Sequence, residues 1–174
     1  MIRLRKIEPS DLPFLYLWEN DDSAWLYSDT HNPLSKQDLR AYIESTTGDI
    51  YRDGQLRLMI INAPDADGTG GEAYGCIDFF DFDARNRKAA IGLYVAPNMR
   101  GKGIGHEAVR QLLHYAFDFL QLRMVYACVA TRNTICTNIY KDFHFKPSSP
   151  LTAWTLEDEA VIWQMTQQTY SAQQ

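Results

Sequence analysis

A glycine-rich segment, Arg100-Gly101-Lys102-Gly103-Ile104-Gly105, is the part of the sequence whose residue types and spacing point most directly to chemistry. Glycines at alternate positions carry no Cβ atom, so successive backbone N–H groups can converge on one anion. A helix that begins here adds the positive end of its dipole, and Arg100 and Lys102 add charge-assisted contacts. We therefore expect this segment to bind a pyrophosphate.

Two other phosphate-binding motifs do not fit the segment. The P-loop requires Lys followed by Ser or Thr after its last glycine, whereas His106 follows Gly105. The dinucleotide motif requires the spacing GxGxxG and an acidic residue about 20 positions later. Here the spacing is GxGxG, and the later run RMVYACVA contains no acidic residue. A reading in which the glycines form only a tight turn stays open.

The elements on either side of the glycines must position them. Residues 89–95, AAIGLYV, are apolar throughout and predict a central strand that is buried on both faces. Residues 105–120 predict a helix, since Val109, Leu112, Leu113, Ala116 and Leu120 recur at helical spacing. Residues 123–130 predict a second apolar strand, so the unit is strand–helix–strand with the two strands parallel.

The rest of the chain predicts further strands and helices around this unit. Alternating or apolar runs predict four more strands, at residues 2–7, 56–62, 73–82 and 159–167. Polar residues at helix starts predict three more helices, opened by Ser10 with Asp11, by Ser35 with Asp38, and by Asn133 or Thr131. The Gly-rich run at 62–73 predicts a surface loop rather than a domain linker. We expect one domain, residues 1–174, with a mixed sheet flanked by helices.

Composition excludes several classes of function. A chain of 174 residues with 45% hydrophobic content is long enough for one substantial core and too short for two ordinary domains. The net charge of −5 and the lack of a clustered basic surface argue against a nucleic-acid partner. No stretch approaches the roughly 20 apolar residues that a membrane span needs, and no signal peptide is visible. Acidic clusters at 18–22 and 78–83 would attract a cationic amine, or serve only solubility.

The cysteines and histidines show no metal-binding spacing. Cys76, Cys128 and Cys136 lie far apart, and the first two stand inside apolar runs. We expect buried thiols in a reducing compartment, and hence a cytoplasmic protein without a metal ion. His106 opens a helix next to the glycine loop and is expected to contact the loop rather than to catalyse a reaction.

The run R-G-K-G-I-G after a strand that ends Val95-Ala96-Pro97 resembles motif A of the GNAT superfamily, the acyl-CoA-dependent N-acetyltransferases. The family pattern Q/R-x-x-G-x-G/A is matched by Arg100, Gly103 and Gly105. The resemblance covers nearly the whole chain, from the LRKIEPSDL opening to a segment similar to N-x-x-A-x-x-x-Y-x-x-x-G-F. In that segment Asn133 and Tyr140 are in register, while Cys136 replaces the usual alanine and His144 the usual glycine.

The resemblance implies the fold and the donor substrate. It implies an α/β fold, mixed α+β, whose central mixed and mostly antiparallel sheet is splayed between two parallel strands. It implies acetyl-CoA, with the pantetheine along the end of the strand 89–95 and the pyrophosphate on residues 100–106. The residues expected to bind this donor are Leu93, Tyr94, Val95, Arg100, Gly101, Lys102, Gly103, Ile104, Gly105, His106, Asn133, Thr137 and Tyr140. Homo-oligomers are common in the family, but no pattern in this sequence determines the oligomeric state.

In such an enzyme Tyr140 is the candidate general acid, because a phenol with a pKa near 10 can protonate a departing thiolate. The backbone N–H of Val95 is the candidate group to polarise the thioester carbonyl. On a helix, Ile135, Ile139 and Phe143 would form the apolar stripe. Tyr140 would then point away from the core, toward the reactants. A tyrosine that only packs, with its hydroxyl hydrogen-bonded, is the alternative.

Asp78 is the second candidate catalytic residue. It interrupts the apolar strand CIDFF, and a carboxylate there lies either at a cleft or in a costly buried position. In the polyamine branch of the GNAT family a glutamate occupies the position that Asp78 resembles, which implies an amine-binding group or, through water, a proton acceptor. Asp78 facing solvent is the alternative. Trp18, Trp25 and Tyr27 would wall an amine pocket or pack in the core.

The function expected from the resemblance is transfer of an acetyl group from acetyl-CoA to a primary amine in a ternary complex. A polyamine such as spermidine is the leading acceptor. A protein N-terminus, as in ribosomal-protein acetylation, and an aminosugar are the alternatives. A non-catalytic acetyl-CoA-binding module is the alternative of another class. The expected partner is thus a small amine, with neither nucleic acid nor membrane involved. The sequence identifies neither the acceptor nor the general base.

Overall fold

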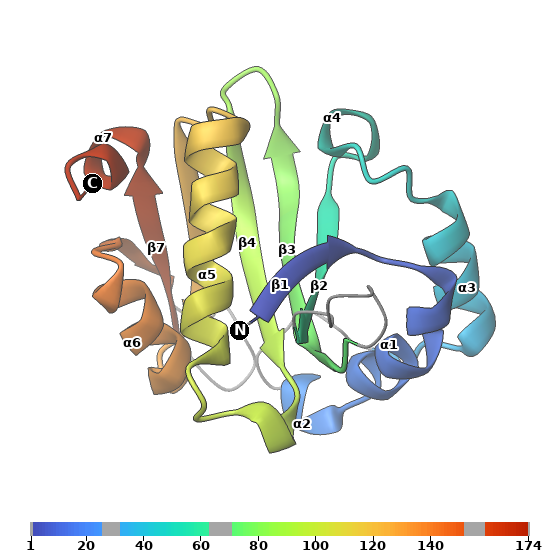
Figure 1. Ribbon diagram of the computed structural model, residues 1–174. Coiled ribbons are helices and arrows are strands. Elements are labelled where there is room, and N and C mark those ends of the chain that lie inside the picture. Colours follow the sequence, from blue (N-terminus) through green and yellow to red (C-terminus); the bar gives the residue numbers. More distant parts are fainter. Residues whose placement is uncertain (1, 26–31, 63–70, 152–158, 174) are drawn as a thin grey trace.

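The computed structural model describes residues 2–25, 32–62, 71–151 and 159–173, and within them the chain forms one seven-stranded sheet (Figure 1). The strand order across the sheet is β1-β2-β3-β4-β5-β7-β6. The strands are β1 Ile2–Lys6, β2 Leu56–Asn62, β3 Ala73–Asp83, β4 Lys88–Val95, β5 Met124–Ala130, β6 Lys146–Leu151 and β7 Ala160–Thr166. Six of the sequence-based strand predictions are confirmed, and β6 was not predicted.

The pair β4 and β5 is parallel, while every other neighbouring pair in the sheet is antiparallel. The parallel pairing covers only Lys88–Ala90 against Met124–Tyr126. From Ile91 onward β4 pairs with β3 alone, so the two parallel strands part toward the end of β4. The predicted mixed, mostly antiparallel sheet with a splay between two parallel strands is therefore confirmed.

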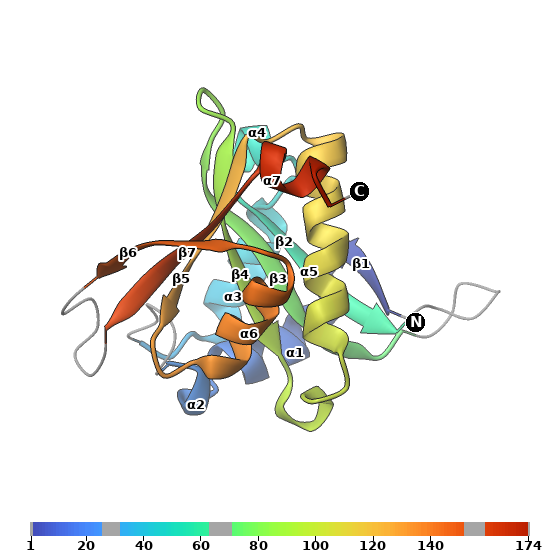
Figure 2. The same ribbon diagram turned by 90° about the vertical axis from the view of Figure 1, so that its left-hand side faces the viewer.

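Helices cover both faces of the sheet. They are α1 Leu12–Glu19, α2 Asp22–Trp25, α3 Lys36–Ser45, α4 Ile50–Asp53, α5 Ile104–His114, α6 Thr134–Asp142 and α7 Gln167–Ser171. The apolar side of α5 packs on one face of the sheet, and α1 and α3 pack on the other, against Met59, Ile61 and Cys76. Seen from the side, α6 lies beside the first turns of α5 (Figure 2). After His114 the chain continues as a π-helical turn, Tyr115–Phe119, so the helix predicted over 105–120 is confirmed with altered geometry.

Two of the three predicted helix starts are confirmed. Ser35 Oγ accepts the Asp38 N–H at 3.1 Å and the Asp38 carboxylate accepts the Ser35 N–H at 3.0 Å, as predicted. Asn133, not Thr131, caps α6. The prediction for Ser10 is wrong, because a 3-10 turn at Pro9–Asp11 precedes α1.

The first helical turn is held by a buried carboxylate instead of a hydroxyl. Asp11 is 1% exposed, accepts the Glu8 N–H at 2.8 Å and receives two bonds of 2.7 Å from Arg5. A bidentate Arg–carboxylate pair is stronger than a hydroxyl cap, which explains why Asp11 rather than Ser10 determines the local geometry.

Burial along the central strands differs from the sequence-based expectation at two points. β4 is buried at Ala89–Ile91 but only half-buried from Gly92 to Val95, where β5 no longer covers its edge. Cys76 is buried as predicted, whereas Cys128 is exposed, because alternate residues of β5 point to the face without α5. No helix among the described residues is long and apolar enough to cross a membrane.

Candidate functional site

The end of β4 presents backbone groups to the side from which β5 has diverged. Ala96, the residue directly after β4, donates its N–H to the Tyr74 carbonyl at 2.8 Å, so its backbone N–H faces β3. Backbone groups of successive residues in a strand alternate in direction, and the N–H and C=O of Val95 therefore face away from β3. This edge is the one along which the sequence predicts the pantetheine to lie.

Gly75 on β3 makes this strand end possible and was missed by the sequence reading. A Cβ atom on Gly75 would lie 2.1 Å from the Tyr94 carbonyl oxygen and 3.0 Å from the Cα of Val95. No side chain fits there, so Gly75 sets how closely β3 and β4 approach at the site. The available signal was a glycine inside an apolar strand, AYGCIDFF, which marks a close backbone approach.

The glycine turn after β4 has the geometry that an anion site requires. Gly101 and Gly103 have φ of 74° and 76°, in the left-handed region that residues with a Cβ atom rarely adopt. Gly103 is the N-cap of α5, so the first N–H groups of a helix of 11 residues open onto the turn. A Cβ on Gly105 would lie 3.2 Å from Leu93 and 3.3 Å from Ile139, which packs this helix start against β4 and α6. The turn thus fits the diphosphate of a CoA thioester.

The two cations of the turn do not both point at the helix start. Arg100 Nε donates to the Val95 carbonyl at 2.9 Å, and its guanidinium lies 5.8 Å from the centre of the Tyr94 ring. Lys102 Nζ lies 3.6 Å from the sulfur of Met99. Both side chains are exposed, so either can reach an anion on the turn by rotation. The ring of His106 stacks on Phe143 at 4.4 Å.

Helix α6 brings Asn133 and Tyr140 to the same region, but with a different buried face from the predicted one. Asn133 Oδ1 accepts the Cys136 N–H at 3.2 Å as the helix cap, and Thr137 is half-buried. Tyr140 is only 3% exposed, whereas Ile135 is 68% exposed. The expectation that Tyr140 points away from the core is wrong, because the inward stripe is Cys136, Ile139, Tyr140 and Phe143.

Burial governs the chemistry of the Tyr140 phenol. Its ring packs 4.9 Å from that of Phe145. Burial, with a smaller contribution from Cys136, raises the pKa of Tyr140 well above its usual value. The phenol therefore stays protonated at neutral pH, which suits a proton donor and excludes a resting phenolate base.

The departure from the family pattern at His144 has a structural consequence. His144 follows α6 with φ of 60°, the left-handed conformation that closes many helices and that glycine adopts at least cost. The helix therefore ends with the geometry of the family pattern although the residue differs.

Asp78 lies in an ion-pair cluster that the sequence did not predict. Arg57 donates from Nε to Asp78 Oδ1 at 3.0 Å, from a terminal nitrogen to Asp78 Oδ2 at 2.8 Å, and from the other terminal nitrogen to Glu19. We call Glu19, Arg57 and Asp78 the Arg57 cluster. Their side chains are 18%, 22% and 19% exposed, so Asp78 neither faces solvent freely nor lies unpaired.

The cluster lies on the face covered by α1 and α3. Burial acts to lower the pKa of Arg57, but Asp78, Cys76 and Glu19 more than offset it and raise the pKa well above the usual value. The guanidinium thus stays charged, and it lies 5.7 Å from the ring centre of Tyr42. In the pairing of β3 with β4, Asp78 lies opposite Gly92, and Gly92 precedes Val95 by three residues.

A second contact joins this face to the end of β4. The Tyr94 hydroxyl donates to Asp21 at 2.9 Å, and the Trp18 ring lies 5.7 Å from that of Tyr94. Trp18 is buried, and the Trp25 indole donates to the Glu19 carbonyl at 2.8 Å. Tyr27, the third predicted wall of an amine pocket, lies outside the described residues.

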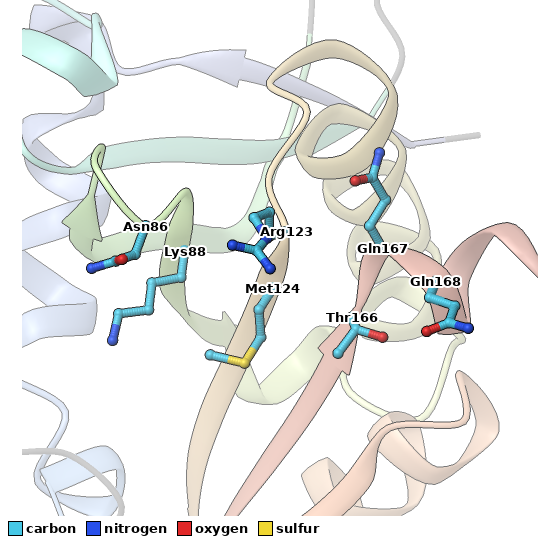
Figure 3. Close-up of a pocket in the computed structure, with 7 residues that line it drawn as sticks. All are labelled: Asn86, Lys88, Arg123, Met124, Thr166, Gln167 and Gln168. Carbon is cyan, nitrogen blue, oxygen red and sulfur yellow. The ribbon is translucent and has the colours of Figure 1, made fainter.

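A cavity of about 480 Å³ lies elsewhere and is not part of this site (Figure 3). It is lined by Asn86, Lys88, Arg123, Met124, Thr166, Gln167 and Gln168. Lys88 begins β4 and Val95 ends it, so the cavity lies at the opposite end of the strand, roughly 24 Å from Val95.

Comparison with known proteins identifies the family. Residues 2–146 match the model of the acetyltransferase (GNAT) domain. The chain belongs to the GNAT acetyltransferases. It is accordingly an acetyl-CoA-dependent N-acetyltransferase, with acetyl-CoA as the donor substrate that the glycine turn and the end of β4 fit.

The proteins to which the chain is similar include acetyltransferases of two kinds. The chain is 23% identical over 154 residues to spermidine N(1)-acetyltransferase of Escherichia coli K12, covering 86% of this chain and 75% of that protein. It is 43% identical over 63 residues to the putative ribosomal N-acetyltransferase YdaF of Bacillus subtilis, covering 36% of this chain and 34% of that protein. The structure of spermidine N-acetyltransferase from Vibrio cholerae in complex with CoA and spermine has a TM-score of 0.85 at 21% identity, with 98% of each chain covered.

Proposed function

We propose that this GNAT enzyme, as a single domain over residues 1–174, transfers the acetyl group of acetyl-CoA directly to a primary amine of a small polycation such as spermidine. The observation that carries the choice of acceptor is the Arg57 cluster. Two carboxylates and one guanidinium leave it with a net negative charge, on the sheet face next to the end of β4. The likeness to the E. coli spermidine enzyme over most of the chain supports the same acceptor class.

The donor side of the reaction follows from the end of β4 and the turn. Acetyl-CoA supplies the acetyl thioester. The first N–H groups of α5 and the glycine turn would hold its diphosphate, with Arg100 and Lys102 adding charge. The outward N–H of Val95 is placed to donate a hydrogen bond to a carbonyl lying along this edge, where negative charge develops during attack by the amine.

Tyr140 would protonate the departing thiolate. Its phenol stays protonated at neutral pH because burial raises its pKa, so the proton is present when the carbon–sulfur bond breaks. The same burial makes the phenol a weaker acid, and contact with the polar thioester would have to restore part of its acidity. Holding amine and thioester together supplies a further part of the acceleration.

Asp78 would bind the acceptor rather than take up its proton. Both of its oxygens accept hydrogen bonds from Arg57, so neither oxygen is left without a donor and directed at the proton of an incoming amine. Its charge remains available to attract an ammonium group at the same face. This assignment keeps the amine-binding role and gives up that of general base.

The proposed function is tested with acetyl-CoA and a panel of amines: spermidine, spermine, a monoamine, an aminosugar and peptides with free N-termini. We expect kcat/KM to be higher for the polyamines than for the other amines of the panel. Faster acetylation of peptides would favour the N-terminal acceptor class, which the 43% identity to the putative ribosomal enzyme makes the second candidate. Binding of acetyl-CoA without turnover of any amine would indicate a non-catalytic module instead.

Assembly into homo-oligomers is a further part of the proposal. One related structure is described as a dodecameric spermidine N-acetyltransferase from V. cholerae, with a TM-score of 0.79. Light scattering on the purified chain measures the assembly state directly.

A further inference from the structure

We propose that Arg57 determines acceptor specificity, by reducing the charge of the acceptor subsite from two negative charges to one, so that the subsite takes a single ammonium group. This inference rests on the proposed function and assigns a role to a residue that the reaction itself does not require.

The position of Arg57 is that of an internal counter-cation. Three of its five N–H groups donate hydrogen bonds to Glu19 and Asp78, which belong to two different elements, α1 and β3. The guanidinium faces the Tyr42 ring from α3 at 5.7 Å. The three charged side chains are each about one fifth exposed, so solvent, and hence a ligand, can reach all of them.

The residue of β4 that faces Asp78 is a glycine and places no side chain beside the carboxylate. A Cβ atom on Gly92 would lie 3.9 Å from Asp78 Oδ2 and 3.4 Å from the Phe80 ring. Phe80, on the same side of β3 as Asp78, is 38% exposed. An aliphatic amine at this place would meet an aromatic ring, a carboxylate and a bare strand backbone, which together suit methylene groups and an ammonium.

The distance to the reacting end decides which part of an acceptor reaches the cluster. Gly92 precedes Val95 by three residues, or about 10 Å along the strand. The nitrogen that is acetylated must come close to Val95, so the group at the cluster is a second, distant one. The acceptor class is therefore an extended diamine or polyamine that keeps one ammonium group away from the reacting nitrogen.

Charge arithmetic makes the role of Arg57 testable. The cluster carries −1 with all three residues charged, −2 in Arg57→Gln, and 0 in Glu19→Gln. Arg57→Lys keeps −1 while losing the bidentate geometry. A charge at close range changes the affinity for one ammonium by about tenfold when the site is partly exposed.

The experiment measures kcat and KM for spermidine and for n-butylamine with wild type and these three variants. We expect the preference for spermidine to rise about tenfold in Arg57→Gln and to fall about tenfold in Glu19→Gln. In Arg57→Lys the preference should stay within about threefold of wild type. The effects should appear in KM for spermidine, shrink with added salt, and leave n-butylamine little changed.

Two controls separate this inference from a structural role and from the proposed function. A melting curve and the shift produced by acetyl-CoA show that each variant is folded and binds the donor. If the variants change both amines by the same factor, Arg57 is only a structural ion pair and the inference is overturned. Calorimetric binding of spermidine in the presence of CoA gives the same ranking of variants independently of turnover. If the four proteins bind spermidine with the expected ranking of affinities but wild type does not acetylate it, the proposed function fails while the inference stands. If the affinity for spermidine is the same in all four proteins, the inference is overturned.

Discussion

The donor side and the acceptor side of this enzyme are built in different ways. The donor side is one continuous stretch, from the end of β4 through the glycine turn into α5, and it offers mainly backbone N–H groups. The proposed acceptor side joins side chains from distant parts of the sequence, such as Glu19, Arg57 and Asp78. In this proposal the donor is bound by backbone geometry, while the acceptor is selected by side-chain charges that can change one at a time.

This comparison predicts that donor-side changes affect every acceptor alike. Tyr140→Phe tests this most strongly, because it removes the hydroxyl that we propose as the proton donor to the departing thiolate and leaves the packing against Phe145. We expect kcat to fall on the order of 100-fold for every amine, with little change in acetyl-CoA affinity. Pre-steady-state measurement of the chemical step checks it. An unchanged rate of that step would remove Tyr140 from the mechanism, and a loss confined to one amine would place it on the acceptor side.

Gly75 provides the next largest effect, because its backbone position cannot hold a side chain. A methyl group in Gly75→Ala would clash with the Tyr94 carbonyl and push β4 away from β3. We expect a loss of about 1–3 kcal/mol in the free energy of unfolding and weaker acetyl-CoA binding. Chemical denaturation and calorimetry measure the two quantities.

Gly92→Ala is the matched control, since it adds the same methyl group to the adjacent strand with only ordinary contacts of 3.4 Å or more. This control should leave the free energy of unfolding and the acetyl-CoA affinity close to wild type. Equal losses in both variants would show that any glycine replacement disturbs the sheet and that Gly75 has no special place at the donor site.

The contrast between a continuous donor segment and dispersed acceptor side chains also explains which features could be predicted from the sequence. The strand, the glycine turn and α5 follow one another in the chain, so local patterns sufficed to predict them and, through the strand–helix–strand order, the parallel pair. The splay of that pair followed from the family resemblance. The ion pairing of Asp78 depends on Arg57, 21 residues away in the chain, and on Glu19, 38 residues from Arg57. No local pattern contains such pairs. The sequence therefore predicts that Asp78 is a carboxylate inside an apolar strand, but it does not predict the partners of that carboxylate.

Helix faces were predictable only where the stripe of apolar residues is unambiguous. In α6 the three apolar residues Ile135, Ile139 and Phe143 suggested one face, yet Tyr140 and Cys136 are buried and Ile135 is exposed. Tertiary contacts such as that of Ile139 with Gly105 of α5 and that of Lys141 with the Trp163 ring of β7 accompany this orientation. The helix sequence alone does not carry that information. β6 was missed for a related reason, because its sequence KPSSPL lacks the apolar alternation of a strand and pairs at the edge with β7.

Tyr94 and Asp21 connect the two sides, and the last prediction measures how strongly. Tyr94→Phe and Asp21→Asn should each weaken the contact, and in a double-mutant cycle the two changes should couple by no more than about 1 kcal/mol, because the pair is partly exposed. The measurement is the free energy of unfolding of the four proteins in the cycle. Fully additive changes would mean that the hydrogen bond does not hold the acceptor face to β4.

The pH dependence of that coupling has a definite sign. Hydrogen bonds from Ser23 first, and then from Tyr94, lower the pKa of Asp21. A carboxylate with a lowered pKa stabilises the folded state above its unfolded pKa of about 3.9, and this contribution is lost as the pH falls through the lower folded value. Burial and the bond to Asp21 raise the pKa of Tyr94, so the phenol remains a donor at neutral pH. The coupling should therefore be constant from pH 7 to about pH 5 and shrink below about pH 4. A coupling that instead grew in acid would assign the contact to a protonated Asp21.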